Sequence, residues 1–291
     1  MLFRSRACGA RAARQYRSAA LSALTRQADA PLALITGASS GIGQALAHAY
    51  LQRGWRVALL ARRADVIEQW LDTVGADRHR VLVLAADVTD ADAMLAAAQQ
   101  CLHRFGLPDV VIANAGISVG MDTAQREDLD VMARLLATNV GGLVASFHPF
   151  VDAMRARGSG TLVGVASVAG IRGMPGHGAY CASKSAAISY CESLRVELRG
   201  SGVRVVTLAP GYIDTPLTRK NRHPMPFLMP ADRFAQQAVR AIDAGTRFRV
   251  IPWQMAWVAR LLRVLPPAWF DAAFARAPRK HRDSDAPPAS R

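Results

Sequence analysis

The chain has 291 residues, 51% of them hydrophobic and 20% charged, which suits one large α/β domain and leaves ample material for a core. No apolar run reaches the roughly 18 residues that a membrane-spanning helix needs. The net charge of +14 raises nucleic acid or an anionic membrane as partners. More than half of that charge, however, lies in residues 1–30 and 276–291, and no basic stripe is interleaved with aromatic residues. We therefore expect no nucleic-acid partner.

The cysteines show neither C-x-x-C pairs nor the spacing of metal ligands. We expect free thiols in a reducing compartment and no metal site. The four residues concerned are Cys8, Cys101, Cys181 and Cys191.

Residues 1–30 are rich in Arg, Ala and Ser and hold no acid before Asp29. This composition is typical of a mitochondrial transit peptide, but it also fits a disordered basic extension or translation from an upstream start codon. Because the whole chain shares the Ala and Arg bias, we favour a disordered extension on a cytoplasmic protein. Mitochondrial targeting stays open.

From Pro31 onward, short apolar runs alternate with longer amphipathic ones. Strands are predicted at 32–35, 56–61, 81–86, 110–113, 161–166, 203–208 and 248–251. Helices are predicted at 42–53, 65–74, 91–105, 129–157, 179–199 and 232–244. This alternation predicts an α/β fold with a doubly wound parallel sheet in three α/β/α layers, formed by one domain over 31–252. Ligands of such folds bind at the carboxyl ends of the strands.

A glycine-rich loop, T-G-A-S-S-G-I-G at 36–43, stands between the first strand and the first helix. Gly37 permits a tight turn, Gly41 lets the backbone approach a pyrophosphate, and Gly43 lets the helix pack close to the strand. The amide groups at the helix N-terminus, with Ser39, Ser40 and Ile42 around them, can receive the negative charge. The loop therefore predicts a dinucleotide cofactor.

The second strand ends in Leu60-Ala61-Arg62-Arg63. An NAD site usually has an acid here to hold both ribose hydroxyls, whereas Arg suits the 2′-phosphate of NADP. No acid occurs at 60–63, and Asp65 is expected inside the next helix. We therefore predict that NADP(H) is preferred over NAD(H), with Arg62 as the clamp and Arg63 as the alternative. In the competing interpretation, both arginines are exposed to solvent and contact no cofactor.

Tyr180 and Lys184 are four residues apart in a predicted helix, so their side chains point into the same space. A nearby cation favours the phenolate and lowers the pKa of a tyrosine toward the working range, which would make Tyr180 a general acid. The Gly-rich run 171–178 can bend the chain back so that Ser167 faces Tyr180 across a carbonyl. Taken alone, Y-x-x-x-K is a weak signal, because the pair also occurs on solvated helix faces.

The joint pattern resembles the short-chain dehydrogenase/reductase family over about residues 31–250. It is carried by the glycine loop, Asp87-Val88, Asn114-Ala115-Gly116, Asn139, Ser167, Tyr180 with Lys184, and Pro210-Gly211. The departures are mild: Ala113 stands where the family often has Asn, and Ala166 where it often has Ser.

The resemblance implies a role for each of these positions. Tyr180 would donate the proton, Ser167 would orient the carbonyl, Lys184 would bind the nicotinamide ribose, and Asn139 would hold a relay water. Asp87 would bond the adenine amino group, Val88 would pack on its ring, and Asn114 would stabilise the central strands. The carboxamide end of the cofactor would be held by Gly211, Ile213 and Thr215.

The resemblance also makes segment 216–230 the substrate lid. Its apolar residues could wall an apolar pocket behind a basic mouth, or the segment could be a solvated loop that packs on the core. The apolar residues are Met225, Phe227, Leu228 and Met229; the basic ones are Arg219, Lys220 and Arg222; and His223 is expected at the surface.

The extension at 253–277 is predicted to be helical and amphipathic, with Arg260 and Arg263 on one face and the apolar residues Trp253, Trp257, Leu261 and Val264 on another. We expect it to close the pocket or pack on a partner subunit, although it could also lie in a membrane interface. Residues 278–291 are expected to be disordered.

The sequence thus predicts an NADP(H)-dependent carbonyl reductase or alcohol dehydrogenase that acts on an apolar small-molecule carbonyl or alcohol. By the resemblance we expect a homodimer through the helices at 129–157 and 179–199. The alternative function is a non-catalytic NADP-binding regulatory or membrane-surface protein on the same fold.

Overall fold

A computed structural model describes residues 30–219, 221, 224–277, 279–280 and 282. The predictions for residues 1–29, for Lys220, Arg222 and His223, and for most of 278–291 lie outside the described residues.

Seven strands form one parallel sheet in the order β3-β2-β1-β4-β5-β6-β9. They are β1 (Leu32–Thr36), β2 (Arg56–Ala61), β3 (Val81–Ala85), β4 (Val110–Ala113), β5 (Gly160–Val165), β6 (Val203–Pro210) and β9 (Phe248–Ile251). The central strands β1 and β4 are buried along their whole length, as expected for a parallel sheet that is covered on both faces. The predicted fold is therefore confirmed.

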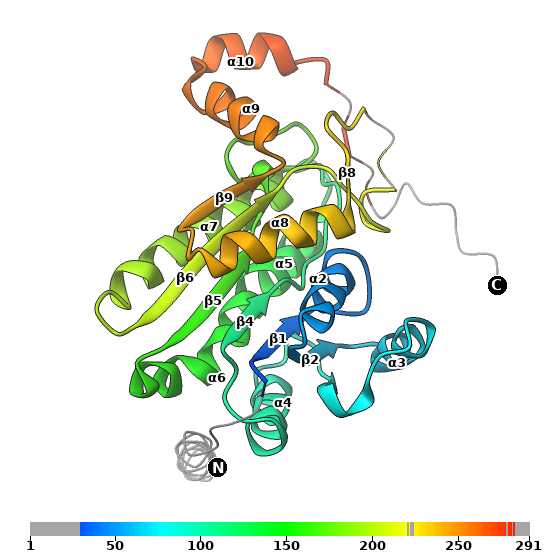
Figure 1. Cartoon of the computed structure of the whole chain (residues 1–291). Coiled ribbons are helices and arrows are strands. Elements are labelled where there is room, and N and C mark those ends of the chain that lie inside the picture. The colour runs from blue at the N-terminus through cyan, green and yellow to red at the C-terminus, as the bar shows by residue number, and fades with distance from the viewer. Residues whose placement is uncertain (1–29, 220, 222–223, 278, 281, 283–291) are drawn as a thin grey trace, which may run out of the picture.

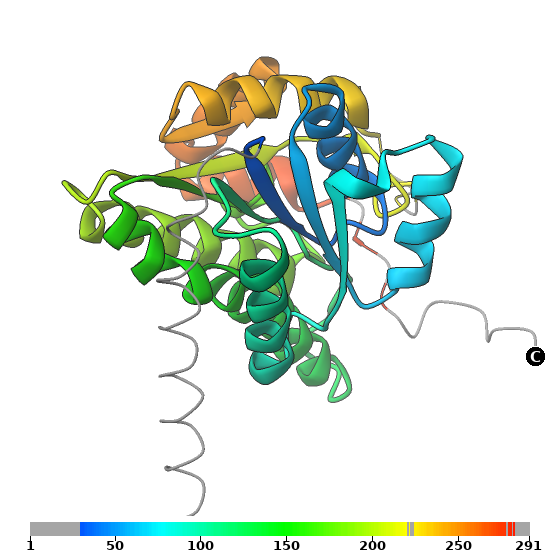
Figure 2. The ribbon, with the colours of Figure 1, turned by 60° about the horizontal axis from the view of Figure 1, so that its bottom comes forward.

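Helices cover both faces of this sheet, as Figures 1 and 2 show. One core cluster joins the sheet to α2 (Gly41–Gln52), α3 (Ala64–Thr73) and α8 (Ala231–Asp243). The other joins it to α4 (Ala91–Arg104), α6 (Gly142–Arg157) and α7 (Gly178–Glu197). Short helical turns occur at η1 (Arg78–Arg80) and η3 (Val168–Gly170). The described helices include none that is long and apolar enough to span a bilayer.

The helix predicted at 129–157 is interrupted by a π-helical turn. It consists of α5 (Asp128–Leu136), the π turn η2 (Ala137–Gly141) and α6. Such single π turns inside helices are frequent at functional sites. Here the turn contains Asn139, which is 1% exposed and bonds to groups on two neighbouring segments.

The segment predicted to be the lid is held by a two-stranded sheet of β7 (Ile213–Asp214) and β8 (Met229–Pro230). Met229 is buried in the core beneath α8, whereas Phe227 and Leu228 are about half exposed. Arg219 pairs with Asp214 at 2.7 Å, so its charge is compensated. Met229 therefore follows the core-packing alternative.

Two helices, α9 (Trp253–Val264) and α10 (Pro267–Phe274), follow the last strand of the main sheet. The helical extension that we predicted is present, but its aromatic face points outward. Met255 and Ala259 pack inward, while the exposed side chains are Trp253, Trp257, Leu261, Val264 and Trp269. The reason is positional: Met255 joins a small cluster with Ala209 and Val250 on the last two strands of the main sheet.

Arg172 attaches these helices to the loop that precedes α7. Its Nη1 donates to the carbonyls of Leu262 and Leu265 at 2.8 and 2.9 Å, near the C-terminal end of α9. Its guanidinium also lies 4.3 Å from the ring centroid of Phe270 in α10. One side chain therefore ties α9 and α10 to the loop that leads to Tyr180.

Candidate active site

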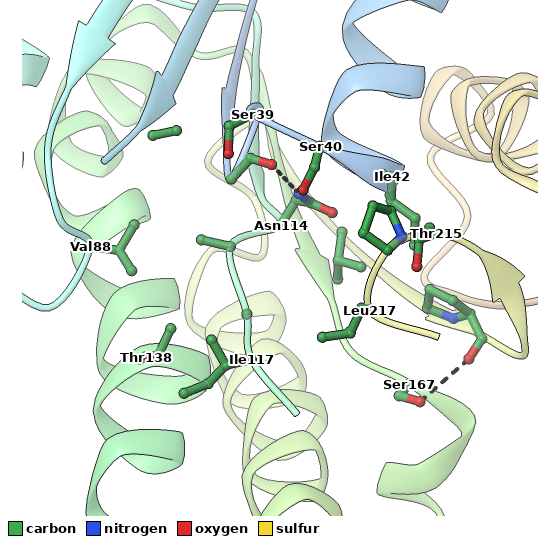
Figure 3. A pocket seen from close by; sticks show the side chains of 18 of the residues that line it. Ser39, Ser40, Ile42, Val88, Asn114, Ile117, Thr138, Ser167, Thr215 and Leu217 are labelled. Atoms are coloured by element: carbon green, nitrogen blue, oxygen red, sulfur yellow. Dashed lines mark hydrogen bonds between the residues drawn. The ribbon is translucent and has the colours of Figure 1, made fainter. Parts of the chain in front are cut away.

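A cleft of about 830 Å³ opens at the carboxyl ends of the parallel strands. All but two of the predicted site residues line it; Gly43 and Asn139 do not. The lining residues among those predicted are Gly37, Ser39, Ser40, Gly41, Ile42, Arg62, Arg63, Asp87, Val88, Asn114, Ala115, Gly116, Ser167, Tyr180, Lys184, Pro210, Gly211, Ile213 and Thr215. In Figure 3, Ser39 and Ser40 lie at one end of this cleft and Ser167 lies at the other.

The glycine loop brings the N-terminus of α2 to the cleft. Gly43 packs beneath the loop, where an added Cβ would lie 2.3 Å from the carbonyl oxygen of Gly37. Ser40 occupies the N-cap position but makes no side-chain capping bond, and the first turn holds no acid. The first amide groups of α2 are therefore left for an anion, which the helix dipole also favours. This part of the cleft fits the pyrophosphate of a dinucleotide.

Asn114 joins the ends of the two central strands beside this loop. Its Nδ2 donates to the carbonyl of Thr36 at 2.9 Å, and its backbone N–H donates to the Thr36 hydroxyl at 3.1 Å. These bonds fix the carboxyl end of β4 against that of β1.

Arg62 and Arg63 line the cleft at the end of β2, and Asp65 lies in the first turn of α3 as expected. Arg62 is 72% exposed and its Nη1 lies 3.6 Å from Oδ2 of Asp87. Burial tends to raise the pKa of Asp87, but hydrogen bonds from Thr89 and the charge of Arg62 outweigh it and hold the pKa below its usual value. Asp87 is therefore ionised at neutral pH, and the exposed Arg62 is free to rearrange.

Ser167 and Tyr180 meet across the loop between β5 and α7. The Ser167 hydroxyl accepts a bond from the N–H of Ala169 at 3.1 Å and donates to the carbonyl of Pro210 at 3.5 Å, and its nearness to Tyr180 tends to lower the pKa of that tyrosine. This approach requires Gly170, because a Cβ there would lie 2.7 Å from the backbone C and O of Lys184. The glycine run thus brings η3 against α7.

Lys184 lies one turn after Tyr180 in α7, with its ammonium 5.9 Å from the ring centroid of Tyr180. The ammonium donates to the carbonyl of Val165 at 2.9 Å and is buried, and this burial lowers the pKa of Lys184 to about 8. We predicted that Lys184 would lower the pKa of Tyr180. In the structure the pKa of Tyr180 is instead raised, because burial outweighs the bond from Ser167.

Asn139 sits behind the cleft and not on its wall. Its Oδ1 accepts from the N–H of Ile117 at 2.8 Å, and its Nδ2 donates to the hydroxyl of Ser183 at 2.9 Å. A Cβ added to Gly116 would lie 3.1 Å from Oδ1 of Asn139 and 3.3 Å from Nζ of Lys184. The two polar groups therefore face the same small space beside Gly116.

The comparisons with known proteins agree with this geometry. A sequence profile described as "short chain dehydrogenase" matches residues 31–226. The chain belongs to this family. Short-chain dehydrogenases are NAD(P)-binding oxidoreductases that act on alcohol and carbonyl groups, and this chain is therefore such an enzyme for small-molecule substrates.

Three similar proteins illustrate the extent of the match. An "Uncharacterized oxidoreductase" of Myxococcus xanthus is 41% identical over 244 residues, which are 84% of this chain and 96% of that protein. The 2-(R)-hydroxypropyl-CoM dehydrogenase of Xanthobacter autotrophicus is 36% identical, covering 65% of this short-chain dehydrogenase and 76% of the relative. A solved structure of the alcohol dehydrogenase from Thermococcus sibiricus, complexed with 5-hydroxy-NADP, aligns with a TM-score of 0.66 at 27% identity, covering 77% of this chain and 96% of that one.

The apolar residues of the predicted lid (216–230) that were expected to wall the pocket, Met225, Phe227, Leu228 and Met229, are not among the residues that line the cleft. Pro216, Leu217 and Thr218, at the start of that segment, line it instead, together with Ile117 and Val119. We predicted the pocket wall from the apolar side chains at 225–229. That criterion does not identify the short turn directly after Thr215.

Sequence reasoning also missed three residues that follow α10. Arg279, Lys280 and Arg282 were expected to be disordered, but Lys280 lies 5.6 Å from the Tyr180 ring centroid and both arginines form ion pairs with the main domain. The only feature that could have indicated these contacts is the group of closely spaced basic residues. The tail is otherwise rich in Pro and Ala, and from that composition we predicted disorder.

Proposed function

We propose that this enzyme transfers a hydride between NADP(H) and the carbonyl or secondary alcohol of a substrate with an apolar body. The observation that carries the proposal is that Ser167, Tyr180 and Lys184 line the same cleft as the glycine loop. The nicotinamide of the cofactor would supply or accept the hydride at the carbonyl carbon. The part of the cleft near Tyr180 has an apolar wall, formed by Ile117, Val119 and Leu217.

In the direction of reduction, Tyr180 donates its hydroxyl proton to the carbonyl oxygen as negative charge develops there. Ser167 gives a second hydrogen bond to the same oxygen, so the charge is stabilised by two donors fixed in advance. The raised pKa of Tyr180 keeps this residue protonated and able to donate at neutral pH.

Lys184 and Asn139 restore that proton. The space beside Gly116, faced by Oδ1 of Asn139 and Nζ of Lys184, suits a bridging water. Lys184 would pass the proton toward Tyr180 and hold the nicotinamide ribose, and Asn139 would hold the water. Its bonds to Ile117 and Ser183 fix the orientation of the Asn139 amide.

The NADP preference rests on Arg62 at the end of β2. An exposed arginine that lines the cleft, with no acid at the β2 terminus, suits a 2′-phosphate. The complex of the Thermococcus sibiricus alcohol dehydrogenase with 5-hydroxy-NADP supports this choice by similarity.

The test is fluorescence titration with NADPH and NADH, followed by turnover on ketones, aldehydes and 3-oxoacyl esters. We expect Arg62→Ala to weaken NADPH binding about 10- to 100-fold, as loss of a charged hydrogen bond would, while NADH binding changes less than about threefold. Arg63→Ala is the matched control. If Arg63→Ala alone weakens NADPH binding, the clamp is Arg63; if neither does, the preference is wrong.

We propose a homodimer through α5, α6 and α7, where Leu129, Leu136 and Val196 are exposed. Light scattering on the purified protein measures this directly. The wild type should have the mass of two chains, and Val196→Asp should shift that mass toward one chain. A wild type with the mass of one chain would reject the dimer.

A peripheral membrane contact is favoured by one further observation, the exposed aromatic face of α9 and α10. Trp253, Trp257 and Trp269 are each more than half exposed, next to Arg260 and Arg263. Tryptophan beside arginine suits the interface of an anionic bilayer. Flotation with anionic vesicles should recover the wild type and lose a Trp253→Ser, Trp257→Ser variant; equal recovery would contradict the contact.

A further inference from the structure

Three described residues that follow α10 return to the main domain beside the cleft. We call Arg279, Lys280 and Arg282 the basic strap. Arg279 pairs with Asp122 at 3.0 Å, and Arg282 pairs with Asp128 at 2.7 Å and with Glu127 at 2.9 Å. Asp128 is almost fully buried, with a side chain 3% exposed, and Arg282 is 20% exposed. Partly buried pairs of this kind hold a segment in place better than surface pairs do.

The loop before Tyr180 is shaped to receive the strap. A Cβ added to Gly176 would lie 2.9 Å from both the Cβ of Arg279 and the backbone N of Lys280. The carbonyl of Gly176 also accepts a bond from the N–H of Met121 at 3.1 Å. The strap, the loop before α7 and the loop after β4 therefore meet at one point.

Lys280 occupies that meeting point. Its ammonium donates to the hydroxyl of Ser118 and lies 5.6 Å from the ring centroid of Tyr180. Ser118 stands between Ile117 and Val119, which both line the cleft. Lys280 is not itself among the residues that line the cleft, but it lies beside the Ile117–Val119 part of the wall and beside the ring of Tyr180.

Among the described residues, no carboxylate compensates the charge of Lys280. Its two neighbours in the strap take the carboxylates of Asp122, Glu127 and Asp128, and within the described part of the chain Lys280 has no carboxylate partner. Partial burial lowers the pKa of Lys280 to about 8. A partly desolvated cation gains most from an anionic ligand, which replaces the lost solvation.

We infer that Lys280 binds an anionic group of the substrate, so the enzyme prefers carbonyl or alcohol substrates that carry a carboxylate or sulfonate on an apolar chain. This inference rests on the proposed function, because it takes Tyr180 to mark the reacting oxygen. The 2′-phosphate of NADP is assigned to Arg62 at another part of the cleft, and it does not compete for this lysine. Arg279 and Arg282 act as positioning residues that hold the strap.

The test compares straight-chain oxo acids of increasing length with their methyl esters, at saturating NADPH. Each pair shares the reacting carbonyl and differs in the charge of the carboxylate and in one methyl group, so the Lys280→Met variant supplies the comparison for the charge. The wild type should show kcat/KM at least about tenfold higher for the best acid than for its ester, as expected for one charge-assisted contact. Lys280→Met should abolish that preference by lowering kcat/KM for the acid, mainly through a higher KM, and should leave kcat/KM for the ester unchanged. Lys280→Arg should retain most of the preference.

Two further variants separate position from charge. Arg276→Met removes the same charge from an exposed side chain outside the strap and should leave the preference unchanged. Arg282→Ala should lower the preference by releasing the strap, with little further loss when it is combined with Lys280→Met.

Each outcome is decisive. If no acid exceeds its ester, Lys280 does not select an anion. If Lys280→Met slows both substrates equally and shifts the pH profile, Lys280 instead acts on Tyr180. If neither these substrates nor the ketones, aldehydes and 3-oxoacyl esters turn over with either nucleotide, the proposed function fails. Calorimetric titration with hexanoate and hexanesulfonate then tests the site alone, and equal binding by wild type and Lys280→Met overturns the inference.

Discussion

The region from β1 to β6 and the region from β7 to the strap build the same cleft by different means. In the first, backbone groups meet at distances that only glycine allows, at Gly43 and Gly170. The second region is attached to the first by side chains, through Arg172 of the first region and through Arg279 and Arg282 of the second. A backbone contact fails as a whole when one atom is added, whereas a side-chain contact can be lost with the fold intact. Most of the predicted cofactor residues lie in the first region, with Ile213 and Thr215 in the second, so substrate choice has more room to vary in the second.

The largest expected effect is the loss of the proton donor. Tyr180→Phe removes the hydroxyl and leaves the ring, so the cofactor should bind within about threefold of the wild type. A positioned proton donor contributes about 10²–10⁴-fold in rate, and kcat should fall by that factor. Stopped-flow measurement of NADPH oxidation, with NADPH binding measured in parallel, checks this. Retained turnover would remove Tyr180 from the mechanism.

The next effect tests the backbone contacts. Gly43→Ala adds a Cβ that would lie 2.3 Å from the carbonyl of Gly37, so the loop must move or the chain must unfold. NADPH binding should weaken at least about tenfold, with a loss of about 1–3 kcal/mol in the free energy of unfolding. Gly173→Ala, where an added Cβ meets nothing within 4 Å, is the matched control and should change neither quantity. If Gly43→Ala and Gly173→Ala have the same NADPH binding and the same stability, the backbone contact at Gly43 does not support the cofactor site.

A smaller effect is expected from the attachment of α9 and α10. Arg172→Ala removes the bonds to Leu262 and Leu265 and the contact with Phe270. The free energy of unfolding should fall by about 1–2 kcal/mol, and NADPH binding should stay within about twofold of the wild type. Urea unfolding and nucleotide titration of the same preparation measure both. A loss of nucleotide binding would show that the second region also supports the cofactor.

The smallest effect concerns Tyr50, whose buried hydroxyl has no partner among the described residues. Burial raises its pKa above the ordinary value near 10, so the folded chain keeps a proton that the unfolded chain releases. Tyr50 therefore contributes nothing to pH dependence below pH about 10, and above it stability falls as pH rises. Tyr50→Phe should change stability at pH 7 by less than about 1 kcal/mol and should lessen the fall between pH about 10 and 11. Thermal unfolding at both pH values checks the sign.

The sequence predicted the first region well because its contacts leave marks in residue type. Gly37, Gly41 and Gly43 follow from backbone approach, and Tyr180 and Lys184 follow from helical spacing. The helix at 129–157 shows the limit, since periodicity does not reveal a π turn at Asn139. The direction of the pKa shift of Tyr180 was also missed, because burial depends on the packing of distant segments.

The second region was predicted less well for the same physical reason. Helix periodicity identified 253–277 as amphipathic, but which face packs inward is decided by Met255 meeting Ala209 and Val250. Lys280 could not be placed, because its position depends on ion pairs with residues more than a hundred positions earlier in the chain. Long-range pairs of this kind leave no local pattern.

Because the strands are parallel, all their carboxyl ends lie at one edge of the sheet and all their amino ends lie at the opposite edge. Strands of four to eight residues separate those edges by roughly 15–25 Å. The cleft occupies the carboxyl edge, whereas Ala30 and Pro31 enter β1 at the amino edge. An affinity handle or a solid support joined before Ala30 would thus hold the enzyme with its cleft facing the solution. The same edge is the place for stabilising turn substitutions, because changes there do not reach the catalytic groups.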